Sequence, residues 1–379
     1  MLRLATVVLL PVALLACAGA GPSRARDARA RDADELSALW SYYRYAFVEA
    51  GRVAALDEGG ISTSEGQSYA LLRAVWSGDR ATFDEVWRWT REHLQVRRGD
   101  RLLSWKWKER VLDANAATDA DVDVALALVL AARRFSDPGY GREAAALLDD
   151  VWRLETVEAG GRRWPTAGNW AAVERYPTLH VGYLAPHAYQ VFAAVDPRHP
   201  WKELVESAYD ALHFIYLEQR LAMPPEKIWL DRGTGRLLLE HPLTHERASF
   251  GYDVVPLFWR VAADAAWWRR GEEALREKML APFAAAWRRD RRILDRYAVD
   301  GRPLSQVEGL PQLASVHALA LIEDGALAAE LRREKLDPLF ARALAGEPTP
   351  YYLHNWLWFD RAFELGAVRR FDEVLGFLR

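Results

Sequence analysis

Apolar residues recur at helical spacing through most of the chain. Two clear runs are Leu36, Leu39, Trp40, Tyr43 and Phe47, and later Ala125, Leu126, Val129 and Leu130. This repeat of about 3.6 residues places apolar side chains on one face of a helix. Alternation typical of strands is scarce. The pattern predicts about a dozen helices, beginning near residues 35, 64, 80, 118, 141, 186, 200, 254, 271, 312, 336 and 351.

The predicted helices form one all-α domain from residue 35 to residue 379. No proline- or glycine-rich linker divides this part of the chain, and no repeat of fixed period suggests a solenoid. Consecutive helices of ordinary length favour an array of antiparallel helix pairs, closed or open. Three short segments, 102–108, 227–231 and 236–239, are instead predicted to be loop hairpins.

The amino terminus has the pattern of an export signal. Arg3 precedes an apolar run from Leu4 to Leu15, which is too short for a permanent membrane span. Cys17 lies where a bacterial lipobox has its lipidated thiol, so residues 1–17 resemble a lipoprotein signal peptide; the alternative is ordinary cleavage near Ala18 or Ala20. Residues 18–34 are small and charged, which predicts a flexible tether. We expect an exported protein, in the periplasm or held at the outer membrane through lipid on Cys17.

Composition narrows the class of partner. The chain has 379 residues and a formal net charge of -3, so it lacks the positive field of nucleic-acid-binding proteins. Its aromatic content, 17 Trp, 14 Tyr and 13 Phe, exceeds what a core requires and suits stacking against sugar rings. One cysteine excludes an intramolecular disulfide framework. We therefore expect a neutral polysaccharide as the partner. We also expect the chain to be a monomer.

Three acidic residues fall at predicted helix starts: Glu65, Asp119 and Asp253. Helices of the same polarity in such an array begin on the same side, so the three carboxyl groups can converge. Acidic residues are also common in first helical turns for purely structural reasons. The predicted capping groups are Ser64 with Gln67, Thr118 with Asp121, and Asp253 itself.

Two motifs carry a resemblance to a known family. Ser62-Thr63-Ser64-Glu65-Gly66-Gln67-Ser68-Tyr69, followed by Ala117-Thr118-Asp119-Ala120-Asp121-Val122-Asp123-Val124-Ala125, resembles glycoside hydrolase family 8, which includes the endoglucanases of bacterial cellulose-synthesis operons. Further matches follow in the family's order: Leu103 to Trp107, Tyr183 to Pro186, Met223 to Pro225 with Trp229, and Phe250 to Asp253.

This resemblance implies an (α/α)6 barrel and inverting, endo-acting hydrolysis of a β-1,4-linked glycan, most simply a β-glucan. Glu65 matches the general acid and Asp253 the proton acceptor that activates water. Asp119 matches the aspartate that binds the sugar at the point of cleavage, and Tyr183 a tyrosine that helps to hold the water. An inverting enzyme needs its two carboxyl groups about 6.5–9.5 Å apart, with room for water. The resemblance also implies that no metal or organic cofactor is needed.

Two departures from the family pattern leave alternatives open. The family usually has Asn-Pro-Ser-Tyr where this chain has His180-Val181-Gly182-Tyr183, and commonly an arginine where this chain has Pro256. The first change affects the support of Tyr183, and the second removes a basic group. A noncatalytic glycan-binding or scaffolding protein on the same fold, or a chitosanase or xylanase, are the alternatives to an endoglucanase.

Aromatic residues supply the predicted substrate-binding set. Trp105 and Trp107 alternate with lysines, which suggests one exposed face of a cleft, and Trp229 is the third predicted platform. Tyr69 and Tyr252, within the acidic motifs, complete the set. Other tryptophans, Trp267 and Trp268 with Trp356 and Trp358, lie within apolar helices and are predicted to be core.

Overall fold

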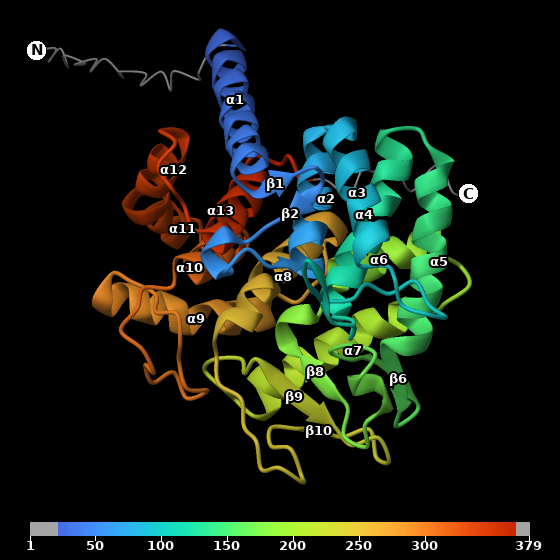
Figure 1. Cartoon of the computed structure of the whole chain (residues 1–379). Helices are drawn as coiled ribbons and strands as arrows, with labels where there is room; N and C mark the ends of the chain where they lie inside the picture. The colour runs from blue at the N-terminus through green and yellow to red at the C-terminus, as the bar shows by residue number, and fades with distance from the viewer. Residues whose placement is uncertain (1–21, 369–379) are drawn as a thin grey trace, which may run out of the picture.

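The computed structural model describes residues 22–368, which form thirteen α-helices with short strands between them (Figure 1). The helices are α1 (Pro22–Phe47), α2 (Ser64–Ser77), α3 (Arg80–His93), α4 (Thr118–Arg134), α5 (Pro138–Leu154), α6 (Pro186–Val195), α7 (Lys202–His213), α8 (Val255–Trp268), α9 (Glu273–Asp290), α10 (Leu310–Glu323), α11 (Gly325–Leu331), α12 (Asp337–Leu344) and α13 (Tyr351–Glu364). The π-helical turn η6 (Arg332–Leu336) joins α11 to α12 without a break, so the described residues contain twelve helical runs.

Most predicted helix starts agree with the structure. The starts near 64, 80, 118, 186 and 351 are confirmed, and those near 141, 200, 254, 271 and 312 are confirmed within three residues. The start near 336 marks only the second half of a run that begins at Gly325.

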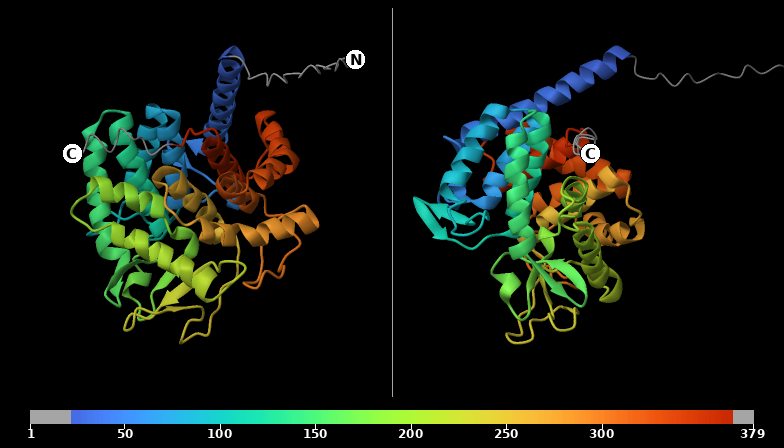
Figure 2. Two further views of the ribbon diagram at one scale, coloured as in Figure 1. Left: turned by 180° about the vertical axis from the view of Figure 1, so that it is seen from behind. Right: turned by 90° about the vertical axis from the view of Figure 1, so that its right-hand side faces the viewer.

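Six helices form the inner ring of an (α/α)6 barrel, which confirms the predicted fold class. Neighbours in the ring contact one another in the order α2, α4, α6, α8, α10 and α13. The ring closes between α13 and α2, where Arg73 donates a 3.2 Å hydrogen bond to Asn355 and the ring of Tyr69 lies edge-on to Trp356. Outer helices cover this ring: α3 packs on α2, α5 on α4, α7 on α6 and α1 on α13 (Figures 1 and 2).

The apolar pattern explains which helices lie inside. In α4 every residue from Thr118 to Ala131 is buried, as expected for a helix that is packed on all sides. In the outer helix α5 the buried residues fall on one face, including Ala144, Leu147, Leu148 and Val151. An all-round apolar helix thus becomes an inner helix, and an amphipathic helix becomes its cover.

Two small sheets flank the cavity described below. One has the order β3-β4-β5, made by Ser62–Thr63, Lys106–Lys108 and Arg110–Asp113; the other has the order β10-β9-β8, made by Leu237–Leu238, Lys227–Leu230 and Thr178–His180. Two short antiparallel pairs lie elsewhere: β1 (Val48–Glu49) with β2 (Arg52–Val53), and β6 (Thr156–Ala159) with β7 (Arg162–Pro165). The hairpin predicted for 227–231 and 236–239 is confirmed as β9 and β10. The hairpin predicted at 102–108 lies later, at 106–113.

The tether predicted for residues 18–34 is wrong from Pro22 onward. Helix α1 begins at Pro22 and stands out from the body of the barrel (Figure 2). Its alanines and arginines are strong helix formers even without an apolar face. At its inner part Asp32 and Glu35 accept hydrogen bonds from Arg361 of α13, at 3.1 and 2.7 Å. Cys17 and the predicted signal lie outside the described residues. Within residues 22–368, no helix combines the length and apolar character that spanning a membrane requires.

Candidate active site

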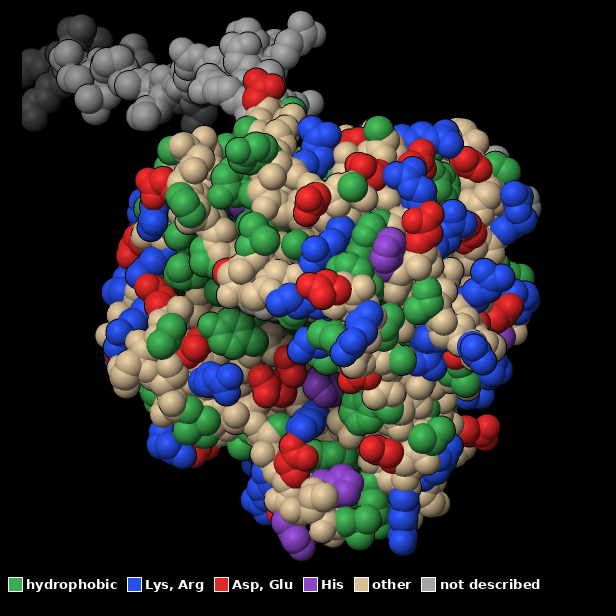
Figure 3. Space-filling view, viewed as in Figure 1, with side chains coloured by type: hydrophobic (Ala, Val, Ile, Leu, Met, Phe, Trp, Pro, Cys, Tyr) green, Lys and Arg blue, Asp and Glu red, His purple; other side chains and the backbone are tan. Residues whose placement is uncertain are grey.

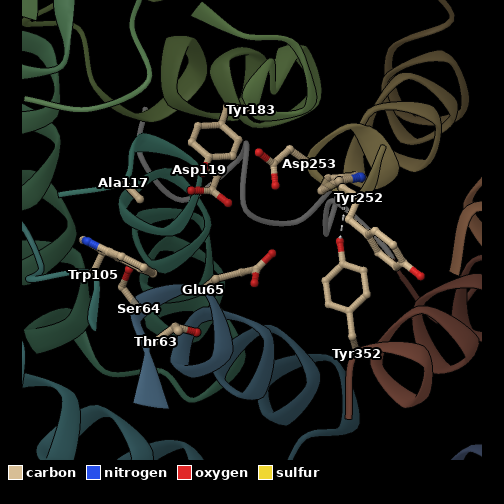
Figure 4. Close-up of a pocket in the computed structure, with 11 residues that line it drawn as sticks. Thr63, Ser64, Glu65, Trp105, Ala117, Asp119, Tyr183, Tyr252, Asp253 and Tyr352 are labelled. Carbon is tan, nitrogen blue, oxygen red and sulfur yellow. Dashed lines mark hydrogen bonds between the residues drawn. The ribbon is translucent and has the colours of Figure 1, made fainter. Parts of the chain in front are cut away.

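The three acidic residues singled out in the sequence line one cavity. Its volume is about 330 Å³, and it opens at the amino-terminal ends of four inner helices: α2, α4, α8 and α13. Figure 4 shows Glu65, Asp119 and Asp253 on three sides of it, and Figure 3 shows acidic side chains around a hollow on this face. The lining residues are Thr63, Ser64, Glu65, Trp105, Ala117, Asp119, Tyr183, Tyr252, Asp253, Pro256 and Tyr352.

A second cavity of about 390 Å³ adjoins the first. The two share Trp105, Ala117, Tyr183 and Asp253, and the second adds Asp113, Asn115, Ala116, Ala167, Trp170 and His180. Together they make a cleft that continues beyond Asp253. Such a cleft has room for more than one sugar unit.

Glu65 lies in the first turn of α2, which is capped differently from the prediction. Thr63, not Ser64, is the N-cap, and its Oγ1 accepts a 3.0 Å hydrogen bond from the Gly66 N–H. Gln67 does not complete a capping box. Its side chain instead accepts from the Val53 N–H at 2.6 Å and is fully buried. The helix start is thereby tied to the β1–β2 turn, which fixes the position of Glu65.

Tyr69 orients Glu65 through a side-chain hydrogen bond within α2. Its hydroxyl donates a 2.7 Å hydrogen bond to Oε1 of Glu65, one helical turn earlier. Only 2% of the tyrosine is exposed, and it does not line the cavity. Contrary to the prediction, Tyr69 therefore does not reach the cavity to contact substrate and instead holds Glu65 in position.

Asp119 lies at the start of α4 and is 3% exposed. Burial raises the pKa of its carboxyl from 3.8 to about 7, and the negative charges of Asp123 and Asp253 act in the same direction, against the opposing effect of Arg260. Asp119 can thus hold a proton near neutral pH.

The predicted cap of α4 is also wrong. Ala117 is the N-cap, Thr118 is the first helical residue, and Asp121 accepts instead from the Leu103 N–H at 3.0 Å. This bond ties the start of α4 to the segment that precedes Trp105.

Arg260 is a site residue that the sequence did not reveal. It lies in α8, is 2% exposed, and donates to Asp123 at 2.7 Å and to the carbonyl of Gly182 at 3.0 Å. Pro256 lines the cavity, whereas Arg260, one helical turn later, does not line it and acts on Asp119 through its charge. Only the contact between α4 and α8 across the barrel could have shown this.

Asp253 is more exposed than the other two acids. It lies in the 3-10 turn η5 (Tyr252–Val254) that precedes α8, so the prediction that it caps the helix is wrong. Its side chain is 52% exposed, which gives water direct access to the carboxylate. Its backbone N–H donates to Glu226 at 3.4 Å, and the Nδ1 atom of His180 lies 3.6 Å from its Oδ2.

Tyr183 and Gly182 belong to η3 (Val181–Tyr183), which packs against Asp253. A Cβ atom on Gly182 would lie 1.7 Å from the Asp253 carbonyl oxygen, so only glycine fits this close approach. Burial, followed by the charges of Asp119 and Asp253, raises the pKa of Tyr183 well above its usual value. Its hydroxyl therefore stays protonated and can donate a hydrogen bond.

The predicted aromatic platforms divide between cleft and core. Trp105 and Tyr252 line the cavity, as predicted. Trp107 lies outside it and packs edge-on against Trp89, and Trp229 is 2% exposed within β9. Trp107 and Trp229 are therefore not placed to stack on a sugar in this cavity.

Tyr352 and Trp170 are cleft aromatics that the sequence did not reveal. Tyr352 follows the start of α13 and donates to the Tyr252 carbonyl at 3.3 Å, as drawn in Figure 4. Its place at the beginning of an inner helix is the signal that could have identified it. Of the tryptophans predicted to be core, Trp267, Trp356 and Trp358 are buried, and Trp268 is only partly buried against the core. Among residues 22–368, no three His, Cys, Asp or Glu side chains are grouped to hold a metal ion.

The chain is similar in sequence and in structure to known proteins. Residues 23–301 match the model of the glycosyl hydrolases family 8. A probable endoglucanase of Novacetimonas hansenii is 31% identical over 266 residues, which are 67% of this chain and 72% of that protein. The structure of an endo-β-1,4-glucanase from Acetobacter xylinum matches with a TM-score of 0.66 and 25% identity, over 88% of this chain and 98% of that chain. An endo-1,4-D-glucanase from Vibrio fischeri ES114 shares the fold, with a TM-score of 0.72 and 21% identity over 86% and 94% of the two chains.

Proposed function

Because the chain belongs to the glycosyl hydrolases of family 8 and is therefore a glycosidase, we propose that it cleaves internal β-1,4 bonds of a glucan with inversion. One observation carries this proposal. Glu65, Asp119 and Asp253 come from three inner helices or their entry turns and line one cavity with Trp105 and Tyr252. Both relatives compared above that share at least 25% identity with this chain are named as glucanases, which favours glucan over chitosan or xylan.

In this mechanism Glu65 and Asp253 act on opposite sides of the glycosidic bond. Glu65, held by Tyr69, donates its proton to the oxygen of the leaving sugar as the bond to the anomeric carbon breaks. A water molecule attacks that carbon from the opposite face and gives its proton to Asp253, whose half-exposed carboxylate is open to solvent. The product has inverted configuration because only one displacement occurs.

Asp119 and Tyr183 hold the sugar and the water. Asp119 is buried at the wall of the cavity, and a carboxyl that is protonated near neutral pH can donate to a sugar hydroxyl. Tyr183 remains protonated and lines the cavity with Asp253, where its hydroxyl can donate to the attacking water. Each added donor counts most where charge develops in the transition state.

The test is release of reducing ends by the whole chain from carboxymethylcellulose, mixed-linkage β-glucan, xylan and chitosan. We expect glucan to be cleaved and Glu65→Gln to reduce the rate by about a thousandfold. Proton NMR of the first product, before mutarotation, should show the α-anomer. Cleavage of only xylan or chitosan would change the substrate. Binding of glucan with no cleavage, equal in wild type and Glu65→Gln, would replace the proposal with a glycan-binding role.

We further propose that the protein is exported and lipidated at Cys17, and that it acts at the cell envelope as a monomer. The support is the apolar run from Leu4 to Leu15 and the thiol that follows it. Cell fractionation with radiolabelled palmitate should find label in the membrane fraction, and Cys17→Ala should abolish it. Unlabelled protein released into the periplasm would show ordinary cleavage instead.

A further inference from the structure

His180 lies beside the carboxylate of Asp253 at the end of β8. Its Nδ1 atom is 3.6 Å from Asp253 Oδ2, and its ring packs on Tyr183 with ring centres 4.7 Å apart. Strand pairing with Lys227 in β9 fixes its backbone. The imidazole is therefore in contact with both Asp253 and Tyr183, the two residues that are proposed to bind the attacking water.

The Nδ1 atom of His180 is buried and has no hydrogen-bond partner within the described residues. A buried polar atom without a hydrogen-bond partner costs free energy of folding. A hydrogen bond from this atom to the Asp253 carboxylate would remove that cost. The distance of 3.6 Å to Asp253 is slightly too long for a hydrogen bond. A small rotation of either side chain would form one, and catalytic hydrogen bonds often tighten only when substrate binds.

The charges around His180 come from three other elements. Asp253 belongs to η5, Lys227 to β9, and Glu246 to the loop after β10. Lys227 and Glu246 form a 2.5 Å ion pair, so their effects on the imidazole oppose each other. Burial lowers the His180 pKa, whereas the charge of Asp253 raises it. The neutral ring, with its proton on Nδ1, can therefore donate to Asp253 at neutral pH.

We propose that His180 is a positioning residue that holds the Asp253 carboxylate, through its Nδ1–H, in the orientation that receives the proton from water. Packing against Tyr183 keeps the imidazole in place. When the ring gains a second proton, its positive charge stabilises the Asp253 carboxylate, which then accepts the proton from water less readily. The pH at which activity falls on the acidic side then depends on the protonation of His180. This inference rests on the proposed function.

The test compares three substitutions that differ in where they place a donor. The Asn amide nitrogen lies where Nδ1 lies, the Gln amide nitrogen lies near Nε2, and Ala has neither. We expect His180→Ala and His180→Gln to lower kcat by about tenfold or more with KM changed less than about twofold. His180→Asn should recover most of the rate, and its acidic limb should move to lower pH because no imidazole titrates there.

His245→Ala is the matched control, since His245 is an exposed histidine that pairs with Glu240. Its pH profile should equal that of wild type. Equal kcat and pH profiles in wild type and His180→Ala would overturn the inference. So would loss of activity in all three His180 variants together with loss of thermal stability, which would indicate a structural role.

An NMR titration of the His180 ring provides a readout that needs no activity. Asp253→Asn should lower the His180 pKa further, because the charge that raises it is gone. An unchanged value would show that the two groups are not coupled. If wild type cleaves no polymer, the proposed function has failed. If Asp253→Asn is inactive while His180→Ala is fully active, only the inference about His180 has failed.

Discussion

The two sides of the cleft hold their carboxyl groups in opposite ways. Glu65 is in the first turn of an inner helix, with Thr63 capping that helix and the Tyr69 hydroxyl hydrogen-bonded to the Glu65 carboxyl group. Asp253 is on a 3-10 turn, with a half-exposed side chain beside a histidine. A proton donor to a sugar oxygen benefits from a fixed position, whereas a base that activates water must be reached by water. The packing of each side thus suits a different half of the reaction.

Substrates with different leaving groups give the largest expected effect and the sharpest test of this contrast. Glu65→Gln should lower the rate on glucan by about a thousandfold, but much less on a dinitrophenyl cello-oligosaccharide, whose leaving group needs no proton. Asp253→Asn should lower the rate on both substrates equally, because water must be activated in each case. Equal losses on both substrates for Glu65→Gln would remove it from the role of acid.

A methyl group added at Gly182 should affect the Asp253 side alone. Its Cβ would meet the Asp253 carbonyl oxygen at 1.7 Å, so η5 must shift. Because small displacements of a catalytic group are costly, we expect kcat to fall by about a hundredfold in Gly182→Ala. Gly325→Ala, where nothing lies within 4 Å of the new atom, is the control and should be fully active. Normal activity in Gly182→Ala would show that the turn is more tolerant than its packing indicates.

Removing the hydroxyl of Tyr69 should weaken the Glu65 side. Tyr69→Phe deletes the 2.7 Å hydrogen bond to Glu65 and leaves the ring contacts with Trp356 and Phe359. We expect kcat to fall by about tenfold, with little change in KM. Tyr45→Phe, at a 90% exposed position, controls for loss of a hydroxyl and should behave as wild type. A rise in KM alone would return Tyr69 to substrate binding.

The smallest expected effect concerns Asp119, whose ionisation makes the stability of the folded protein depend on pH. Its pKa rises from 3.8 to about 7 on folding, so the folded state binds the proton more tightly than the unfolded state. The native protein therefore loses stability as pH rises from about 4 to about 7. Asp119→Asn, which cannot ionise, should raise Tm at pH 7.5 but not at pH 4. Thermal unfolding at both values decides this, and an equal shift at both would contradict it.

Most of the helices could be predicted from the sequence because their apolar residues recur at helical spacing. Helices α4 and α5 both show this pattern, which depends only on residues close together in the chain. The three acids were also found from the sequence, since Glu65, Asp119 and Asp253 stand at predicted helix starts. The error over residues 22–34 arose because a helix of Ala, Arg and Asp has no apolar stripe, and the ion pairs of Arg361 with Asp32 and Glu35 involve distant residues.

The sequence by itself therefore determined most of the helices and the acids at their starts, because these depend on residues close together in the chain. Closure of the helices into a ring was expected only from the resemblance to a known family. Only the tertiary structure decided which side chains share the cleft. Trp229 is buried while Trp105 faces the cavity, although both are tryptophans on short strands or loops. Arg260 and Tyr352 join the site, and His180 meets Asp253, through contacts between residues 73 to 137 positions apart. Such contacts depend on how the ring of helices closes, which local patterns do not encode.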